Sequence, residues 1–276
     1  MNPRLDRPTG DMKERILNLL PRRIYLELKR REFKHVHPDR FDRMQELRQG
    51  MTHQGYSYKP FDDLQSIFVH IPKCAGVSVS KTLFGGLAGG HMTLDGYLNV
   101  FEPQCILNYF KFSIVRNPWD RLVSAYFFLK NGGFNDDDKQ WFNMELGNLP
   151  SFESFVNNWL NRTNIWKCQH FQPQYHYMIE KREKVKLDFV GFMENIEGDF
   201  QYIADRIGVK RNLANSNSGA HDSYLGYYDE TTRKIVADVY AEDIKMLGYN
   251  FDNSNIARQV AERTAGKRYS LRDATI

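Results

Sequence analysis

Short apolar runs alternate along this chain with longer segments in which apolar residues recur every three or four positions. The short runs are rich in β-branched and aromatic side chains and predict strands at 66–71, 112–115 and 188–190. The periodic segments predict helices at 120–129, 152–160, 194–207 and 231–247. Strands that alternate with helices favour an α/β fold, here a three-layer sandwich with a central, mostly parallel sheet flanked by helices.

The N-terminal segment carries most of the positive charge. Residues 1–50 hold 13 Lys and Arg against 8 Asp and Glu, although the formal charge of the whole chain is only +4. Residues 11–34 have the spacing of a basic helix that is broken near Pro21. Such a helix either presents a solvated face or lies against anionic lipid or an acidic partner, and both interpretations stay open.

Composition excludes several classes of protein. With 276 residues, 41% hydrophobic and 14% aromatic, the chain can bury a sizeable core. Its charge is too small for a nucleic-acid coat, and no apolar run reaches the roughly 18 residues of a membrane-spanning helix. Cys74, Cys105 and Cys168 have neither zinc-site spacing nor the density of a disulfide framework. We therefore expect no metal and a reducing compartment. Because the N-terminus lacks a signal-peptide pattern, we also expect a cytoplasmic protein.

A candidate anion-binding loop follows the first predicted strand. The sequence PKCAGVS runs from Pro72 to Ser78, and a helix after it would direct free backbone N–H groups toward an anion. Gly76 lets the backbone approach a ligand, Lys73 adds a positive charge, and Ser78 adds a hydroxyl donor. The Walker A pattern GxxxxGK[ST] is absent, and Lys73 instead precedes the glycine. The alternative is an ordinary strand–turn–helix with a surface lysine.

A second motif, RNPWDRLVSAY, begins at the end of the second predicted strand. Arg116 stands at the carboxyl edge of the sheet, where open α/β sheets bind ligands, and Pro118 suits the first turn of a helix. Ser124 lies about two turns into that helix. Arg116 and Ser124 are therefore candidates to bracket one anion, with the guanidinium as a bidentate fork.

Together, in this order and at this separation, the two motifs resemble those of the sulfotransferases that use 3′-phosphoadenosine 5′-phosphosulfate (PAPS). PKCAGVS is similar to the superfamily's 5′-phosphosulfate loop, and RNPWDRLVSAY to its 3′-phosphate motif. The stretch RLVSAYFFL is most similar to the carbohydrate branch, with its 2-O- and Gal/GalNAc-type enzymes. DFVGFMENIEGDF and YYDETTRKIVADVYAEDIKMLGYNF also resemble family segments, so the likeness spans residues 64–251.

This resemblance implies a P-loop-like sulfotransferase domain over 64–251, a basic, mostly helical extension over 1–63 and a tail over 252–276. It implies direct in-line transfer of a sulfuryl group from PAPS to a hydroxyl of a carbohydrate or glycolipid, with no metal. The implied PAPS-binding residues are Lys73, Cys74, Ala75, Gly76, Val77, Ser78, Arg116 and Ser124. Lys73 would also act catalytically, on the leaving oxygen.

The acceptor hydroxyl needs a base, and His91 in the sequence GGHM is the first candidate. It resembles a histidine in a "GH" context that acts as base in the 2-O-sulfotransferase branch, and an imidazole titrates near neutrality. The alternative is an ordinary loop histidine. His70 is expected to be structural. Weaker candidates for the base are His170, His176, His221 and Glu102.

Three further segments contain polar, aromatic or acidic residues that suggest a role. Ser218, His221 and Tyr224 belong to a polar late loop that resembles the family's cofactor-covering loop. Aromatic and amide side chains suited to sugar recognition are Trp166, Gln169, Gln172, Pro173 and Gln174. The acidic run Asp136–Asp138 is expected to be a solvated loop rather than a metal site.

Two rival functions stay open at the level of sequence. A P-loop-type kinase would need Mg·ATP, and a non-catalytic module on the same fold would bind a glycan or an acidic partner. Peripheral contact with a membrane through the basic N-terminus is compatible with each of these functions. The identity of the acceptor and the oligomeric state cannot be predicted from the sequence, because acceptor pockets are built from variable loops.

Overall fold

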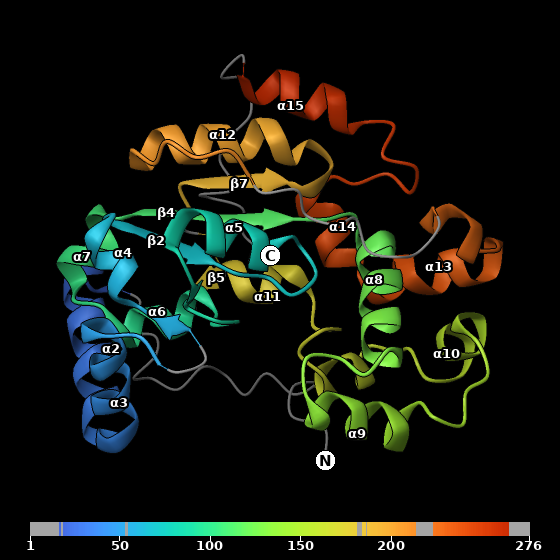
Figure 1. Ribbon diagram of the computed structural model, residues 1–276, viewed down its shortest axis with the longest axis horizontal. Coiled ribbons are helices and arrows are strands. Elements are labelled where there is room, and N and C mark those ends of the chain that lie inside the picture. Colours follow the sequence, from blue (N-terminus) through green and yellow to red (C-terminus); the bar gives the residue numbers. More distant parts are fainter. Residues whose placement is uncertain are drawn as a thin grey trace.

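Three parallel strands form the centre of the protein (Figure 1). The computed structural model describes residues 17, 19–52, 55–180, 184–185, 187–213 and 223–264. The strands β2 (Ser66–Val69), β4 (Phe110–Val115) and β7 (Phe189–Phe192) pair in the order β2-β4-β7. Phe112 of β4 lies opposite Phe68 on one side and Phe189 on the other. All residues of β2 and β7 are buried, as a parallel sheet covered on both faces requires.

Helices surround this sheet and confirm the α/β fold. The helices preceding β4 are α2 (Arg22–Val36), α3 (Pro38–Gln49), α4 (Lys59–Asp63), α5 (Gly76–Phe84), α6 (Leu94–Val100) and α7 (Pro103–Asn108). Those after β4 are α8 (Pro118–Lys130), α9 (Asp136–Glu145), α10 (Phe152–Asn158), α11 (Gln174–Met178), α12 (Ile196–Ile207), α13 (Glu230–Val239), α14 (Ala241–Leu247) and α15 (Ile256–Thr264). Short 3₁₀ turns are η1 (Asn164–Lys167), η2 (Met193–Asn195) and η3 (Tyr224–Tyr227). Two-residue strands are β1 (Tyr56–Ser57), β3 (Leu87–Ala88), β5 (Ile179–Glu180) and β6 (Lys184–Val185).

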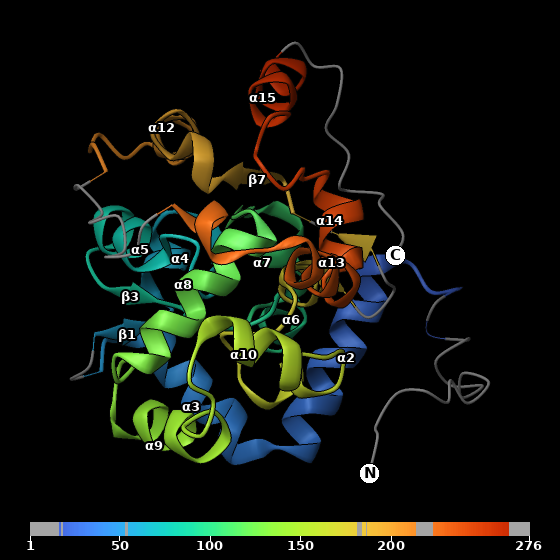
Figure 2. The ribbon, with the colours of Figure 1, turned by 90° about the vertical axis from the view of Figure 1, so that its right-hand side faces the viewer.

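The buried apolar side chains form two clusters. One surrounds the sheet and includes Phe68, Phe112 and Val190. The other holds together α8, α9, α10 and α13 and includes Leu122, Phe155 and Val236. These helices gather on the side toward which the strand arrows point in Figure 1, and Figure 2 looks onto α10 and α13 from that side. The carboxyl ends of the strands therefore face α8, the helix that begins with the second motif.

Helices α2 and α3 pack into the sheet-centred cluster through Tyr25, Leu26 and Met44. Their basic side chains also pair with acids of the core. Arg48 contacts Asp62 at 2.8 Å and Glu102 at 2.9 Å. Glu102 is thus engaged by an arginine in a structural ion pair, which argues against its use as a base. None of the described helices has the length and apolarity required to cross a membrane.

Two expectations about local structure were wrong. The helix predicted over 231–247 is two helices, since the backbone of Tyr240 leaves helical geometry between α13 and α14. The acidic run at 136–138 is not a solvated loop: it forms the first turn of α9, where the Asn135 side chain accepts a hydrogen bond from the Asp138 N–H at 3.0 Å. Acidic residues stabilise the positive end of a helix dipole, so the run fits this position.

Candidate active site

The loop between β2 and α5 is strained at two residues that are not glycine. Lys73 and Ala75 have φ angles of 69° and 56°, in the left-handed region. Each such residue costs about 1–2 kcal/mol, because its Cβ crowds the following carbonyl. The surrounding structure therefore has to hold this loop in place, a property common at functional sites.

Gly76 is required for packing rather than for a positive φ. A Cβ at this position would lie 1.8 Å from Cδ2 of the His70 ring. His70 itself is 5% exposed and stacks on Phe68 with ring centroids 5.5 Å apart. The structural role expected for His70 agrees with this packing. The glycine is needed because the imidazole fills the space in front of the α5 N-terminus.

The first turn of α5 leaves donors unused. Ala75, the residue before the helix, makes no side-chain cap, and within the described residues the N–H groups of Gly76, Val77 and Ser78 have no acceptor. Free N–H groups at a helix N-terminus attract anions. Cys74 is 1% exposed, and burial raises the pKa of its thiol to about 12, so its side chain is not a nucleophile.

Lys73 extends from this loop toward α8. Its Nζ lies 3.9 Å from the centre of the Phe128 ring, a cation–π contact. Burial, and next the nearby Arg116, lowers the pKa of Lys73 to about 8. At neutral pH the amine is therefore charged, yet it gives up its proton more easily than a solvated lysine does.

Arg116 stands at the end of β4, and its side chain makes three hydrogen bonds to two partners. Its Nε and Nη2 donate to Asp120 at 2.7 and 2.8 Å, and its Nη1 donates to the carbonyl of Lys73 at 3.3 Å. The side chain is 12% exposed. Arg116 therefore connects the second motif directly to the first.

Asp120, Ser124 and Phe128 form one stripe along α8, because residues four apart share a helix face. Asp120 pairs with Arg116 at one end of this stripe, and Phe128 holds Lys73 at the other. Ser124 lies between them, is 7% exposed and has no hydrogen-bond partner among the described residues. Ser124 thus lies between the two cationic side chains, although no hydrogen bond joins it to Arg116.

Gln174, expected to recognise sugar, instead fixes the backbone between the motifs. Its Oε1 accepts from the Arg116 N–H at 2.9 Å, and its Nε2 donates to the Arg116 carbonyl at 2.8 Å. The same Oε1 lies 3.4 Å from the Cys74 sulfur. Asp243 of α14 accepts from the N–H groups of Gln174 and Tyr175, both at 2.8 Å. Sequence reasoning gave Asp243 no role, since 69 residues separate it from Gln174.

Arg121 is a second residue that the sequence does not place in the site, since it suggests only a structural helix-start charge pair with Asp120. It is 2% exposed, and its guanidinium donates to the carbonyls of Pro72 at 3.1 Å, His170 at 3.2 Å and Gln172 at 2.6 Å. One buried side chain thereby ties the anion-binding loop to the segment before α11. An arginine beginning a helix is usually a surface residue, so no local signal indicates this contact.

His91 lies beside this loop. Its Nδ1 is 3.2 Å from the His70 carbonyl, and the rings of His91 and His70 are 4.2 Å apart. This contact favours a proton on Nδ1 and leaves Nε2 as the free acceptor. Burial, and next the nearby cations Arg121 and Lys73, lowers the pKa of His91 below its ordinary value. The neutral, base-competent form therefore predominates at neutral pH.

His170 and Asp138 complete the surroundings of His91. The His170 ring lies 6.0 Å from the His91 ring and 4.9 Å from the Phe128 ring. Its Nε2 is 3.7 Å from Oδ1 of Asp138. Across the described part of the chain, no group of three His, Cys, Asp or Glu side chains is arranged to hold a metal ion.

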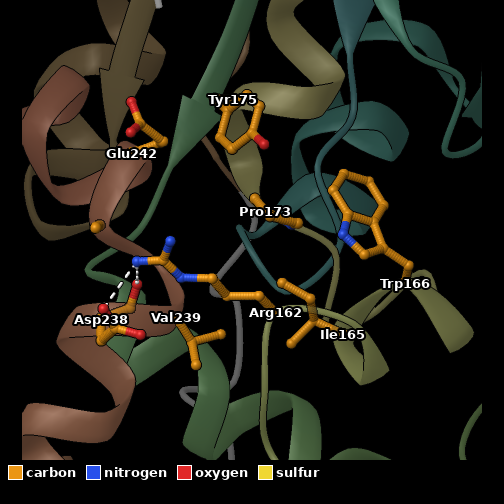
Figure 3. Close-up of a pocket in the computed structure, with 9 residues that line it drawn as sticks. Arg162, Ile165, Trp166, Pro173, Tyr175, Asp238, Val239 and Glu242 are labelled. Carbon is orange, nitrogen blue, oxygen red and sulfur yellow. Dashed lines mark hydrogen bonds and ion pairs between the residues drawn. The ribbon is translucent and has the colours of Figure 1, made fainter. Parts of the chain in front are cut away.

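The remaining candidates line a separate pocket, are engaged in contacts with the backbone, or fall outside the described residues. Trp166 and Pro173 line a separate pocket of about 150 Å³ with Arg162, Tyr175 and Glu242 (Figure 3). His176 packs against Trp166 with ring centroids 5.0 Å apart. Gln169 and Gln172 offer their carbonyls to Tyr177 and Arg121. The Tyr224 hydroxyl is bonded to the Phe251 carbonyl, and Ser218 and His221 lie outside the described residues.

Comparison with known proteins identifies the family of this chain. A family model described as "Sulfotransferase family" matches residues 96–250, more than half of the chain. The match contains the second motif, the downstream segment at 188–200 and all but the last residue of the one at 227–251, whereas the loop at 72–78 and His91 precede it. An uncharacterized protein of Archaeoglobus fulgidus is 34% identical over 118 residues, which cover 42% of this chain and 82% of that protein.

Carbohydrate sulfotransferase 14 of Danio rerio is 25% identical over 181 residues, or 55% of this chain. The chain spans just under half, 48%, of that relative's length. No solved structure matches. An α/β fold of this class binds ligands at the carboxyl ends of its parallel strands, where the lysine loop meets the arginine that precedes α8. Within that class, this chain belongs to the sulfotransferase family.

Proposed function

We propose that this sulfotransferase takes its sulfuryl group from PAPS and transfers it to a hydroxyl of a carbohydrate or glycolipid. The observation that carries the proposal is the arrangement around α8. The Lys73 loop, Arg116 and Ser124 surround one helix face, with cations at both ends of the stripe. PAPS carries phosphates at both its 3′ and 5′ positions, and two cationic ends suit two anions better than one.

The residues of the chain divide the work on the donor. The unused N–H groups of Gly76, Val77 and Ser78 would bind the 5′-phosphate, and Arg116 with Ser124 would bind the 3′-phosphate. Lys73, charged at neutral pH, would stabilise negative charge on the departing phosphate oxygen. The main task of these residues is to hold the donor in a fixed orientation, because a direct displacement needs aligned reactants.

On the acceptor side, His91 would remove the proton of the attacking hydroxyl. The new bond joins the acceptor oxygen to sulfur, the bond from sulfur to the phosphate oxygen breaks, and the proton moves to Nε2 of His91. The Nδ1–H of the same ring stays on the His70 carbonyl and fixes its orientation. This assignment makes His91 the base and leaves His70 as its support.

Location and partners belong to the same proposal. We infer a cytoplasmic enzyme with no nucleic-acid partner. Lys29, Arg30 and Arg48 of the N-terminal helices are already paired with acids of the core. Contact with anionic lipid would therefore fall to the exposed bases such as Arg31, whose side chain is 75% exposed.

Titration with 3′,5′-ADP, the desulfated product of PAPS, tests the donor assignment. Isothermal calorimetry should show binding of 3′,5′-ADP and little binding of 5′-AMP or Mg·ATP. Loss of the charge-assisted bonds in Arg116→Ala should weaken 3′,5′-ADP by about a hundredfold, and Ser124→Ala by about tenfold. Arg31→Ala is the matched control, because Arg31 also pairs with a carboxylate four residues away, Glu27, but lies on α2.

The rival functions give different results in the same experiment. Binding of Mg·ATP without 3′,5′-ADP would replace the proposal with a P-loop-type kinase. Binding of neither nucleotide would favour a non-catalytic module. Equal losses in Arg116→Ala and Arg31→Ala would show that the charge of the protein, rather than the α8 stripe, attracts the nucleotide.

A further inference from the structure

His170 is a buried histidine whose ring nitrogens have no hydrogen-bond partner among the described residues. The side chain is 6% exposed, and both Nδ1 and Nε2 are buried and unpaired. Leaving one buried polar atom unsatisfied costs about 1–3 kcal/mol, so native proteins rarely tolerate two on one ring. The unpaired nitrogens therefore mark a place where a ligand supplies the missing partner.

The ring is held in place from several sides. Arg121 holds the His170 carbonyl at 3.2 Å, and the ring packs against Phe128 with centroids 4.9 Å apart. His91, the proposed base, lies 6.0 Å away, centroid to centroid. The unpaired imidazole thus lies next to the ring that the proposed function makes the base.

Asp138 faces His170 across a short gap that an oxygen atom can contact only from the side. The distance of 3.7 Å between His170 Nε2 and Asp138 Oδ1 is too long for a hydrogen bond. An oxygen can lie about 2.8 Å from both atoms at once. A hydroxyl both donates and accepts, so it can accept from an Nε2–H of His170 and donate to the carboxylate.

The carboxylate is itself positioned for this role. Oδ2 of Asp138 accepts from the Phe134 N–H at 2.8 Å, which leaves Oδ1 toward His170. A Cβ on Gly133 would lie 2.2 Å from the Cβ of Asp138, so the loop before α9 closes tightly over this side chain. Asp138 is 18% exposed, and it forms the more open side of the gap.

The charge state of the gap suits a neutral group. Burial, and next His91, Lys73 and Arg121, lowers the pKa of His170 to about 3. The imidazole is then uncharged at neutral pH, whereas Asp138 carries a negative charge. A hydroxyl gains hydrogen bonds from both, while a sulfate or carboxylate would be repelled by Asp138.

We propose that His170 and Asp138 form a subsite for a second, unsubstituted hydroxyl of the acceptor, next to the hydroxyl that His91 deprotonates. The acceptor is then a polyol such as a sugar with neighbouring free hydroxyls, and an acceptor already sulfated at the neighbouring position is excluded. This inference rests on the proposed function for the role of His91. Its two recognition groups, however, are independent of the donor.

Nitrogen-15 NMR of histidine-labelled protein tests the subsite, with and without saturating 3′,5′-ADP. The probes are trans-cyclohexane-1,2-diol and methyl β-D-galactopyranoside, and cyclohexanol is the control with a single hydroxyl. His170→Gln assigns the resonances and keeps a polar donor in the gap. Asp138→Asn removes the charge, and Asp136→Asn, in the same exposed turn of α9, is its matched control.

We expect the diol and the glycoside to shift both His170 ring nitrogens saturably, and cyclohexanol to leave them unmoved. Asp138→Asn should weaken this response about tenfold, and Asp136→Asn should not change it. Unmoved His170 resonances, or an equal response to cyclohexanol, would overturn the subsite. A response to the glycoside in a protein that does not bind 3′,5′-ADP would keep the subsite and remove the sulfotransferase donor assignment.

Discussion

The two sides of the candidate site are built on opposite principles. On the donor side, charged groups are already paired: Arg116 is bonded to Asp120 and to the Lys73 carbonyl, and Gln174 fixes the backbone between them. On the acceptor side, His170 is buried with both ring nitrogens unpaired. A binding site for a charged ligand and one for a neutral ligand therefore differ in how their side chains are paired before the ligand binds.

The difference follows from electrostatics. Cations that hold phosphate need fixed partners, because two long, charged side chains would otherwise repel each other and lose orientation in the empty site. A neutral imidazole needs no counter-ion, although each unpaired nitrogen costs about 1–3 kcal/mol until a partner binds. The cations of the donor side are therefore preorganised by internal pairs, whereas the neutral N–H groups at the start of α5 and the neutral imidazole of the acceptor side are left unpaired.

Replacing Arg121 should break both sides together and produce the largest effect. In Arg121→Met, the buried carbonyls of Pro72, His170 and Gln172 lose their donor. We expect a loss of about 3 kcal/mol in the free energy of unfolding in urea. We also expect weaker binding of 3′,5′-ADP and a weaker response of His170 to the glycoside.

Arg48→Met separates this result from general destabilisation. Arg48 is also a poorly exposed arginine with several acceptors, Asp62 and Glu102 among them, but it lies on α3. It should lose stability while 3′,5′-ADP affinity stays unchanged. If Arg121→Met kept full affinity for both ligands, Arg121 would not connect the two sides.

Replacing Gly76 should damage the donor side, where α5 begins. The Cβ of Gly76→Ala would overlap the His70 ring, so either the imidazole or the start of α5 has to move. Such overpacking costs about 1–3 kcal/mol, and we expect 3′,5′-ADP to bind more than tenfold weaker. Calorimetry and urea unfolding measure the two effects.

A double-mutant cycle identifies the cause of the Gly76 effect. His70→Ala combined with Gly76→Ala should recover part of the lost stability, since the ring no longer occupies the space. Gly226→Ala is the control, because no atom lies within 4 Å of a Cβ there. Additive losses in the double variant would mean that His70 is not the obstacle.

The same contrast explains which parts of the site were readable in the sequence. The segments 72–78 and 116–126 are each continuous in sequence. The strand–turn–helix pattern of each one indicates where its N–H groups and cations lie. The three strands were predicted for the same reason: each is a short, mostly apolar run, buried throughout in β2 and β7 and at every residue but Phe110 in β4.

The acceptor side was not readable, because its residues come from distant segments. Asp138 and His170 are brought together only when α9 packs beside α8. Asn135 followed by three aspartates was a local signal of a helix start, and the expectation of a solvated loop missed it. Gln174 resembled a sugar ligand by type, whereas its backbone contacts depend on Asp243, 69 residues away. The amide side chain of Gln174 suggested a sugar contact, whereas tertiary packing pairs it with the backbone of Arg116.

The smallest expected effect is the pH dependence of kcat/KM, which compares His91 on the acceptor side with Lys73 on the donor side. His91 must be neutral to accept a proton, and its lowered pKa keeps it neutral until the pH falls below the ordinary value of 6.5. Lys73 must be charged, and its pKa of about 8 means that it loses its proton as the pH rises through that value. The profile should be a bell, with each limb falling about tenfold per pH unit.

One substitution distinguishes the two limbs. In Lys73→Arg the cation cannot lose its proton in this range, so the alkaline limb should disappear while the acid limb stays. His170→Gln should leave both limbs in place and raise KM more than it lowers kcat, since His170 binds a hydroxyl and moves no proton. An alkaline limb that persists in Lys73→Arg would assign it to another group and would leave the donor side without its proposed acid–base boundary.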